Sequence, residues 1–233
     1  QVDYERLGIR IKKENIINLI ASNSIWANDN SMPLKELLQN SVEACRYREF
    51  NTPPSRNYKP SIKVIFDKVK RHIIVIDNGC GMSKNIILNN FLTVGNSRAS
   101  NPVYKSYRYN SLARFGIGFW SVFTIASEAI IETAPFELLT DNQNQQVEGY
   151  KFTVSIVEFK EYTVFHSQRM RIGTKVILKI KEGISIDDIL AKINNIVMCS
   201  QIPIEVESSD GVKFVLPLVP QLLEEKDFFG PKG

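Results

Sequence analysis

A carboxylate beside a flexible turn is the first candidate for chemistry in this chain. Residues 73–76, Ile-Ile-Val-Ile, predict a strand that is buried on both faces, and Asp77 follows it directly. The next residues, 78–82, are Asn-Gly-Cys-Gly-Met, and their two glycines end the strand. A buried carboxylate is unfavourable unless hydrogen bonds compensate its charge, so Asp77 either accepts from a ligand or only caps its own turn. Taken alone, the motif favours the cap.

A second set of polar residues shares one face of a predicted helix. Residues 34–48 contain neither glycine nor proline, and Ser31 is placed to cap the N-terminus of the helix. Glu36, Asn40 and Glu43 are spaced i, i+4 and i+7, so they lie on one face, next to the apolar stripe. We expect this face to be partly buried. A solvated polar stripe is the alternative, and this helix alone favours it.

Two glycines before a third predicted helix are candidates for anion binding. The sequence of residues 115–119 is Phe-Gly-Ile-Gly-Phe, and residues 120–126 predict a buried helix. Glycines at a helix N-terminus can leave backbone N–H groups free for a phosphate. The alternative is a glycine turn that only allows close packing, and a single Gly-x-Gly is weak evidence.

The remaining pattern predicts a mostly antiparallel sheet with helices on one face. Further helices are expected at 14–22, from an N-cap at Ser83 to about 92, and from a capping box at Ser185 to about 197. Strands are expected at 8–11, 62–66, 73–76, 129–133, 150–157, 163–165, 175–180, 202–206 and 212–216. Because strands and helices do not alternate regularly, this order favours an α+β fold over a doubly wound parallel sheet. The polar stretch 93–114 predicts a functional lid or a disordered loop.

The composition excludes several classes of protein. The 233 residues are 43% hydrophobic and 23% charged, which is typical of a globular domain with a sizeable core. A net charge of +4 is too weak to predict nucleic-acid binding. Three widely spaced cysteines and two histidines match neither a zinc site nor a disulfide framework. No apolar run has the length of a membrane span and no signal peptide is visible, so we expect a cytoplasmic protein without membrane contact.

Together these motifs resemble the GHKL ATPase superfamily, and most of all the N-terminal nucleotide domain of the ninety-kilodalton heat-shock chaperones. That family has the motifs E-L-x-x-N-x-x-D-A, D-x-G-x-G-M and Q-F-G-V-G-F-Y-S. This chain has ELLQNSVEA at 36–44, DNGCGM at 77–82 and RFGIGFWS at 114–121, with the family's Gly-Thr pair at 173–174. The resemblance covers roughly residues 8–207. It implies a two-layer α+β sandwich of the Bergerat type, with a mostly antiparallel mixed sheet and helices on one face.

The resemblance also implies roles for individual residues. Asp77 would accept a hydrogen bond from the adenine amine, and Thr174 would join the network around the base. Asn40 would be the Mg ligand, and Glu36 would be the catalytic base that activates the attacking water. The other nucleotide-binding positions that the resemblance implies are Glu43, Ala44, Gly81, Met82, Asn90, Ser97, Phe115, Gly116, Ile117, Gly118 and Phe119.

The family organisation carries over as a further set of expectations. Residues 1–216 would form the ATP-binding domain, with a lid at about 93–114, and 217–233 would be a tail or linker toward a missing domain. ATP or ADP with Mg would be the cofactors, and the full-length protein would be a homodimer. Because the family also draws catalytic groups from a middle domain, we expect weak or no turnover from this chain. Client and partner proteins stay unknown.

Four positions depart from the family pattern and predict a divergent member. Glu43 replaces Asp, Tyr47 replaces Lys, Asn96 replaces Lys and Arg114 replaces Gln. These changes affect nucleotide affinity and lid dynamics more than the fold.

Three functions are therefore in competition. They are an ATPase that drives a conformational cycle, a nucleotide-gated regulatory or protein-interaction module whose output lies in another domain, and a degenerate domain that binds a protein without nucleotide. The intact acidic and amide positions of the motifs argue against the last.

Overall fold

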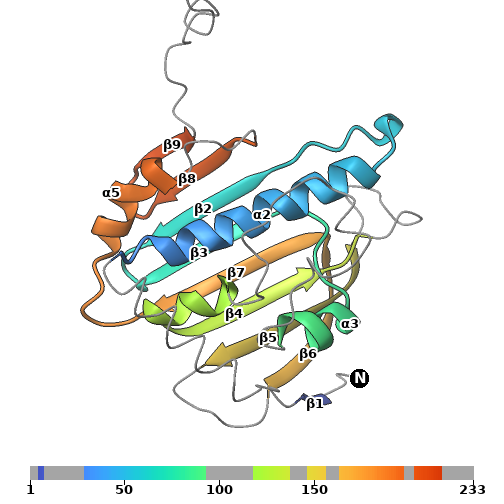
Figure 1. Cartoon of the computed structure of the whole chain (residues 1–233), viewed down its shortest axis with the longest axis horizontal. Coiled ribbons are helices and arrows are strands. Elements are labelled where there is room, and N and C mark those ends of the chain that lie inside the picture. Colours follow the sequence, from blue (N-terminus) through green and yellow to red (C-terminus); the bar gives the residue numbers. More distant parts are fainter. Residues whose placement is uncertain are drawn as a thin grey trace, which may run out of the picture.

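A nine-stranded sheet with helices on one face forms the fold in the computed structural model (Figure 1). The strands are β1 (Glu5–Leu7), β2 (Ile62–Asp67), β3 (His72–Asp77), β4 (Ala126–Ala134), β5 (Gln146–Ser155), β6 (Thr163–Arg171), β7 (Gly173–Ile180), β8 (Ile204–Ser208) and β9 (Lys213–Leu216). Their order in the sheet is β1-β6-β5-β4-β7-β3-β2-β8-β9. Neighbours are antiparallel except β2 and β8, which are parallel. The predicted mixed, mostly antiparallel α+β sheet is confirmed.

The structure describes the chain in six ranges, 5–7, 29–92, 118–136, 146–155, 163–196 and 202–216. Several predictions lie outside these residues and stay predictions. They are the strand at 8–11, the helix at 14–22, the lid at 93–114 and the tail at 217–233. In the described part of the chain, no helix is both long and apolar enough to cross a membrane.

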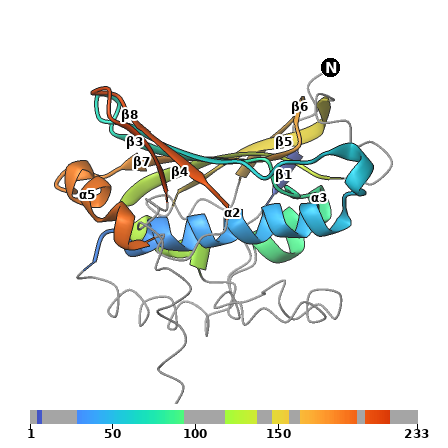
Figure 2. The ribbon, with the colours of Figure 1, turned by 90° about the horizontal axis from the view of Figure 1, so that it is seen from above.

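The helices form the second layer of the fold (Figure 2). They are α2 (Met32–Asn51), the short 3-10 helix η1 (Pro54–Arg56), α3 (Lys84–Ile86), the π-helical turn η2 (Ile87–Phe91), the 3-10 helix η5 (Gly118–Thr124) and α5 (Ile186–Ile196). The helix predicted at 120–126 thus begins and ends two residues earlier, because β4 already starts at Ala126.

Two of the three predicted N-caps form their side-chain bond. The Ser83 hydroxyl accepts from the N–H of Ile86 at 3.4 Å, and the Ser185 hydroxyl accepts from the N–H of Asp188 at 3.1 Å. Ser31 precedes α2 as predicted, but its side chain makes no capping bond to the helix. Its hydroxyl donates to Asp29 at 2.7 Å instead. The helix start is therefore predicted correctly, whereas the side-chain bond at Ser31 is not.

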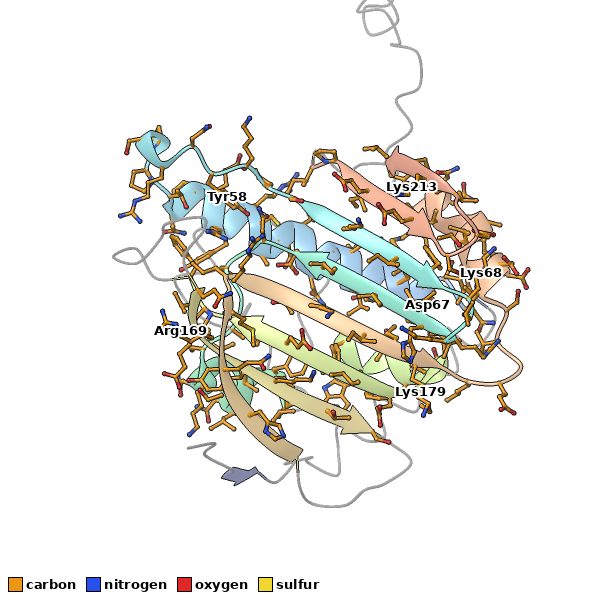
Figure 3. All side chains as sticks on the ribbon, turned by 180° about the vertical axis from the view of Figure 1, so that it is seen from behind. Tyr58, Asp67, Lys68, Arg169, Lys179 and Lys213 are labelled. Atoms are coloured by element: carbon orange, nitrogen blue, oxygen red, sulfur yellow. The ribbon has the colours of Figure 1, made fainter. Side chains whose placement is uncertain are left out.

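The strand before Asp77 is buried on one face only, so the prediction of burial on both faces is wrong. Ile73 and Val75 are 0% and 2% exposed, whereas Ile74 and Ile76 are half-buried. The cause is the arrangement of layers, because α2 covers one side of the sheet and, among the described elements, no helix covers the other side (Figures 2 and 3). Side chains at every second position of a strand point to the same face, and Asp77 lies four residues after the buried Ile73. The side chain of Asp77 therefore points toward the helical layer.

The core lies between α2 and the sheet. The predicted apolar stripe of α2 is buried at Leu34, Leu37, Leu38 and Cys45, while Val42 packs at the edge of the core. The opposite face of the sheet instead carries ion pairs, such as Glu132 with Lys151 at 2.9 Å. One face of the sheet therefore supports α2, and the polar groups at the end of β3 lie beneath that helix.

Candidate functional site

The side chain of Asp77 is held by several elements at the end of β3. It is 8% exposed. Its Oδ1 accepts from the N–H of Gly79 at 2.9 Å, and its Oδ2 accepts from the hydroxyl of Ser41 on α2 at 3.1 Å. Burial raises the pKa of Asp77 to about 6, although these bonds, the backbone N–H of Thr174 and the charge of Arg48 lower it. Asp77 is therefore mostly ionised at neutral pH, and it caps its turn while also bonding to the helix above.

A row of polar residues crosses the sheet next to Asp77. Asp77 pairs with Thr174 on β7, and Thr174 pairs with Thr133 on β4. The two threonine hydroxyls lie 3.0 Å apart, and the hydroxyl oxygen of Thr133 accepts from the N–H of Met82 at 3.0 Å. Thr174 therefore lies beside the carboxylate of Asp77. The network continues to Met82 through Thr133.

Sequence reasoning missed Ser41 and Thr133, although both leave a signal in the sequence. Thr133 is 0% exposed and lies on the same face of β4 as the buried Ala129 and Ile131, which occupy alternate positions of the strand. Ser41 is 5% exposed and lies four residues before Cys45 on the apolar stripe of α2. A hydroxyl at a position that the periodicity assigns to the core needs a hydrogen-bond partner. That requirement would have marked both residues.

Two glycines let the turn and β7 approach Asp77 closely. Gly81 has a φ of 57°, and a Cβ there would lie 1.9 Å from the carbonyl oxygen of Ala134. Gly173 has a φ of 131°, and a Cβ there would lie 2.1 Å from the carbonyl oxygen of Asp77. Any larger residue would push the backbone apart at either position. The glycines of the DNGCGM and Gly-Thr motifs therefore fix the close packing around the carboxylate.

A second buried carboxylate, Glu36, lies on α2 against η5. Glu36 is 9% exposed, and burial raises the pKa of its carboxyl. A Cβ on Gly118 would lie 2.5 Å from its Oε2, so the first residue of η5 contacts the carboxylate directly. Asn40, one helical turn further along α2, has an exposed side chain. A buried carboxylate with a raised pKa is suited to proton transfer, and an exposed amide oxygen is available to a hard cation.

The other predicted positions are distributed around these two carboxylates. Ala44 lies at the turn after β3, because its carbonyl accepts from the N–H of Cys80 at 3.0 Å. Glu43 and Asn90 are half-buried on α2 and η2, and Met82 is 7% exposed. The Phe119 ring packs on that of Phe91, with centroids 4.4 Å apart, and so joins η5 to η2. Four predicted positions lie outside the described residues, namely Ser97, Phe115, Gly116 and Ile117.

The structure has a mixed sheet in which a central strand ends in a buried aspartate. A helix that carries a glutamate lies above this aspartate. The family resemblance implies this arrangement. The chain belongs to the family of histidine kinase-, DNA gyrase B- and HSP90-like ATPases, because the model of that family matches residues 30–174. The predicted superfamily and fold are thereby confirmed.

Curated relatives place the chain near one branch of this family. It is similar to proteins named chaperone protein HtpG from Ehrlichia ruminantium (strain Gardel), at 26% identity over 193 residues, and from Clostridium botulinum (strain Loch Maree / Type A3), at 30% over 189 residues. A third, from Coxiella burnetii (strain RSA 493 / Nine Mile phase I), is 28% identical over 193 residues. The matches cover 77%, 77% and 78% of this chain but only 29%, 28% and 29% of the relatives. The chain thus spans less than a third of the length of these relatives.

Proposed function

We propose that this domain binds ATP and ADP together with Mg and hydrolyses ATP slowly to drive a conformational cycle, as in a chaperone-type ATPase. The observation that carries the proposal is the buried, ionised Asp77 beside the hydroxyls of Thr174 and Thr133. The adenine amine is a donor that needs an anionic or carbonyl acceptor. An ionised carboxylate can accept about four hydrogen bonds, so Asp77 can accept from the base while keeping its bonds to Gly79 and Ser41.

The residues beside α2 fit magnesium and a catalytic base. Within the described residues, no group of three or more His, Cys, Asp or Glu side chains is placed to hold a metal ion. The exposed side-chain amide of Asn40 offers an oxygen ligand to a cation that keeps several waters and binds phosphate oxygens. Bound Mg would neutralise phosphate charge. Glu36, held by burial against Gly118, would orient and deprotonate the attacking water.

The greater length of the relatives supports the proposal that this domain acts as one module of a longer protein. The relatives that it matches are more than three times as long as the matched region, and their printed names describe chaperones. We place the ATP-binding domain at 1–216, with a closing lid at about 93–114, and a linker to another domain at 217–233. We also propose that the full-length protein forms a homodimer and acts in the cytoplasm.

A nucleotide-gated regulatory or interaction module is the second candidate function. The same length difference supports it, because the output of a switch would lie in a domain outside this chain. Turnover by the full-length protein separates the two. Nucleotide binding that is tight with no measurable hydrolysis favours the switch, whereas slow hydrolysis coupled to a conformational change favours the ATPase cycle.

Calorimetric titration of this chain with ADP and with a non-hydrolysable ATP analogue, each with and without Mg, tests the proposal. We expect saturable binding that Mg strengthens. The matched variant is Asp77→Asn, which nearly preserves the shape of the side chain and removes its charge, and we expect it to abolish binding. Normal binding by Asp77→Asn would show that the adenine site is assigned wrongly. No binding of either nucleotide by the unchanged chain would overturn the function itself.

A further inference from the structure

A buried arginine lies near the C-terminal end of α2. Arg48 is 3% exposed, although arginine is almost never fully buried unless its charge is compensated. Its guanidinium lies 4.6 Å from the ring centroid of Tyr58 and 5.5 Å from that of Phe136. Tyr58 belongs to the loop after α2 and lies beside the end of that helix (Figure 3), whereas Phe136 follows β4. Two separate segments thus hold the guanidinium by cation–π contact.

The same guanidinium bonds to the backbone that follows Asp77. Nη1 of Arg48 donates to the carbonyl oxygen of Asn78 at 2.7 Å, and the Tyr58 hydroxyl also lies 3.0 Å from this oxygen. The side chain of Asn78 is held as well, because its Oδ1 accepts from the N–H of Ser61 at 2.8 Å and its Nδ2 donates to the carbonyl of Lys59 at 2.8 Å. The peptide after Asn78 leads to Gly79, whose N–H bonds to Asp77. Arg48 therefore fixes the turn that orients the carboxylate.

Arg48 also brings a positive charge close to the carboxylate. The titratable groups that act on Asp77 from the elements packed against it are Arg48 and Cys45 on α2 and Tyr58 on the following loop. Burial raises the pKa of the Cys45 thiol to about 12 and raises that of Tyr58 further, so both are neutral near pH 7. Among these described groups, Arg48 is the one that opposes the effect of burial on Asp77 by its charge.

We propose that Arg48 is a positioning residue for nucleotide binding, which holds the peptide after Asp77 in place and sets a positive charge behind the carboxylate that accepts the adenine amine. This inference rests on the proposed function. It adds a residue outside the motifs of the sequence, at the end of α2 opposite to Glu36. Arg48 would not touch the nucleotide, since its guanidinium is occupied by Asn78 and by two aromatic rings.

The test compares two substitutions of Arg48 with one of a matched arginine. Arg48→Met removes the charge and the donors, and Arg48→Lys keeps the charge. Arg71→Met is the control, because Nη2 of Arg71 donates to the carbonyls of Lys181 and Ile184, at 2.7 and 2.8 Å, at the other end of β3. ADP with Mg is titrated by calorimetry between about pH 5.5 and 8.5. Carbon-detected NMR follows the titration of the Asp77 carboxyl without nucleotide, and thermal unfolding checks each fold.

We expect Arg48→Met to weaken ADP binding about tenfold at pH 7 and to move the Asp77 titration to higher pH. Arg48→Lys should lose less affinity and keep the titration near that of the unchanged chain. Arg71→Met should lower the melting temperature and leave both properties unchanged. Unaltered binding and titration in Arg48→Met would overturn the inference, as would an equal loss of affinity in Arg71→Met.

Two further measurements decide the question if Arg48→Met does not fold or if the unchanged chain does not bind ADP. If Arg48→Met does not fold, Arg48→Lys and Tyr58→Phe decide, because Tyr58→Phe keeps the ring and removes only the hydroxyl at Asn78. Unchanged ADP affinity in both would then overturn the inference. If the unchanged chain binds no ADP while an Arg48 substitution still shifts the Asp77 titration, the proposed function fails. The positioning role in nucleotide binding falls with it, and the electrostatic link between Arg48 and Asp77 stands.

Discussion

The two buried carboxylates of the proposed site are held in different ways. Asp77 accepts hydrogen bonds from Gly79 and from Ser41, so its turn and α2 both fix it. Glu36 is buried to a similar extent, at 9% against 8%, but no described residue donates a hydrogen bond to its carboxylate. Its position depends instead on burial and on close contact with Gly118.

This difference matches the two tasks that we propose. A carboxylate that recognises a base must present its oxygens in one fixed arrangement, and hydrogen bonds from several elements provide that arrangement. A general base must take up a proton, so its oxygens must stay available to water, and a pKa raised by burial favours that task. Burial raises the pKa of both groups. Hydrogen-bond donors and the charge of Arg48 oppose this effect at Asp77, whereas the charge of Lys35 opposes it at Glu36.

Replacing Glu36 should give the largest functional effect and separate the two carboxylates most clearly. We expect Glu36→Gln to lower ATP turnover by about 100-fold or more, the usual contribution of a general base, and to leave ADP affinity unchanged. The measurement is steady-state ATP hydrolysis by the full-length protein, alongside calorimetry with ADP. Lys35→Gln, at the neighbouring position of α2, is the control and should retain turnover. A Glu36→Gln protein that loses ADP binding would place Glu36 in recognition instead.

Adding the same methyl group on each side of the site should give opposite results. At Gly81 a Cβ would meet a backbone carbonyl at a positive φ, so we expect Gly81→Ala to destabilise the fold by about 3 kcal/mol or more. At Gly118 it would meet the end of the Glu36 side chain, which can move. Gly118→Ala should therefore leave the free energy of unfolding nearly unchanged and lower turnover about tenfold. Equal losses of stability in urea unfolding would contradict this comparison.

The same comparison shows what the sequence could predict. Periodicity located α2 and β3, and the spacing of Glu36 and Asn40 together with the glycine turn after Asp77 marked both carboxylates. These are local patterns, and the family motifs gave them roles. Local patterns did not indicate that Thr133 lies beside Thr174, because that neighbourhood depends on the register between β4 and β7. That pairing joins residues 41 positions apart.

Two other features that the sequence did not predict share this non-local origin. Arg48 falls in the last turns of a predicted helix, where an arginine is ordinarily solvated, and its burial depends on Tyr58 and Phe136 from two other segments. The one-sided burial of β3 has the same cause, since Ile74 and Ile76 predict a buried strand until the layer that covers the sheet is known. Residue patterns therefore identified the chemical groups, while the tertiary arrangement determined which groups support them.

Lowering the pH should affect recognition and stability in opposite directions. Burial raises the pKa of Asp77 from its ordinary 3.8 to about 6, so the folded state binds this proton more readily than the unfolded chain does. The stability of the ligand-free domain should therefore increase as the pH falls from about 6 toward 4, as far as Asp77 alone is concerned. ADP affinity should instead fall about tenfold per pH unit below 6.

Thermal unfolding and calorimetry across this pH range test both effects. Because phosphate groups also titrate near pH 6, adenosine is compared with ADP, and only a loss shared by both is assigned to the protein. Asp77→Asn lacks the titrating group, so its stability should lose this component of the pH dependence. Adenosine affinity that stays constant down to pH 5 would show that the base does not bind to the Asp77 carboxylate.

Removing the bond between α2 and Asp77 should give the smallest effect and measure how far the two regions depend on each other. Ser41→Ala deletes the hydroxyl that donates to Oδ2, and the turn still supplies the N–H of Gly79. One such bond contributes about 1 kcal/mol, so we expect ADP affinity to fall about fivefold and turnover at saturating ATP to stay unchanged. Ser155→Ala is the control, because its hydroxyl donates to the carbonyl of Ser127 on the sheet, away from Asp77. If both variants bind ADP equally well, the turn alone positions Asp77. A simultaneous loss of turnover would instead mean that α2 transmits changes at Asp77 to Glu36.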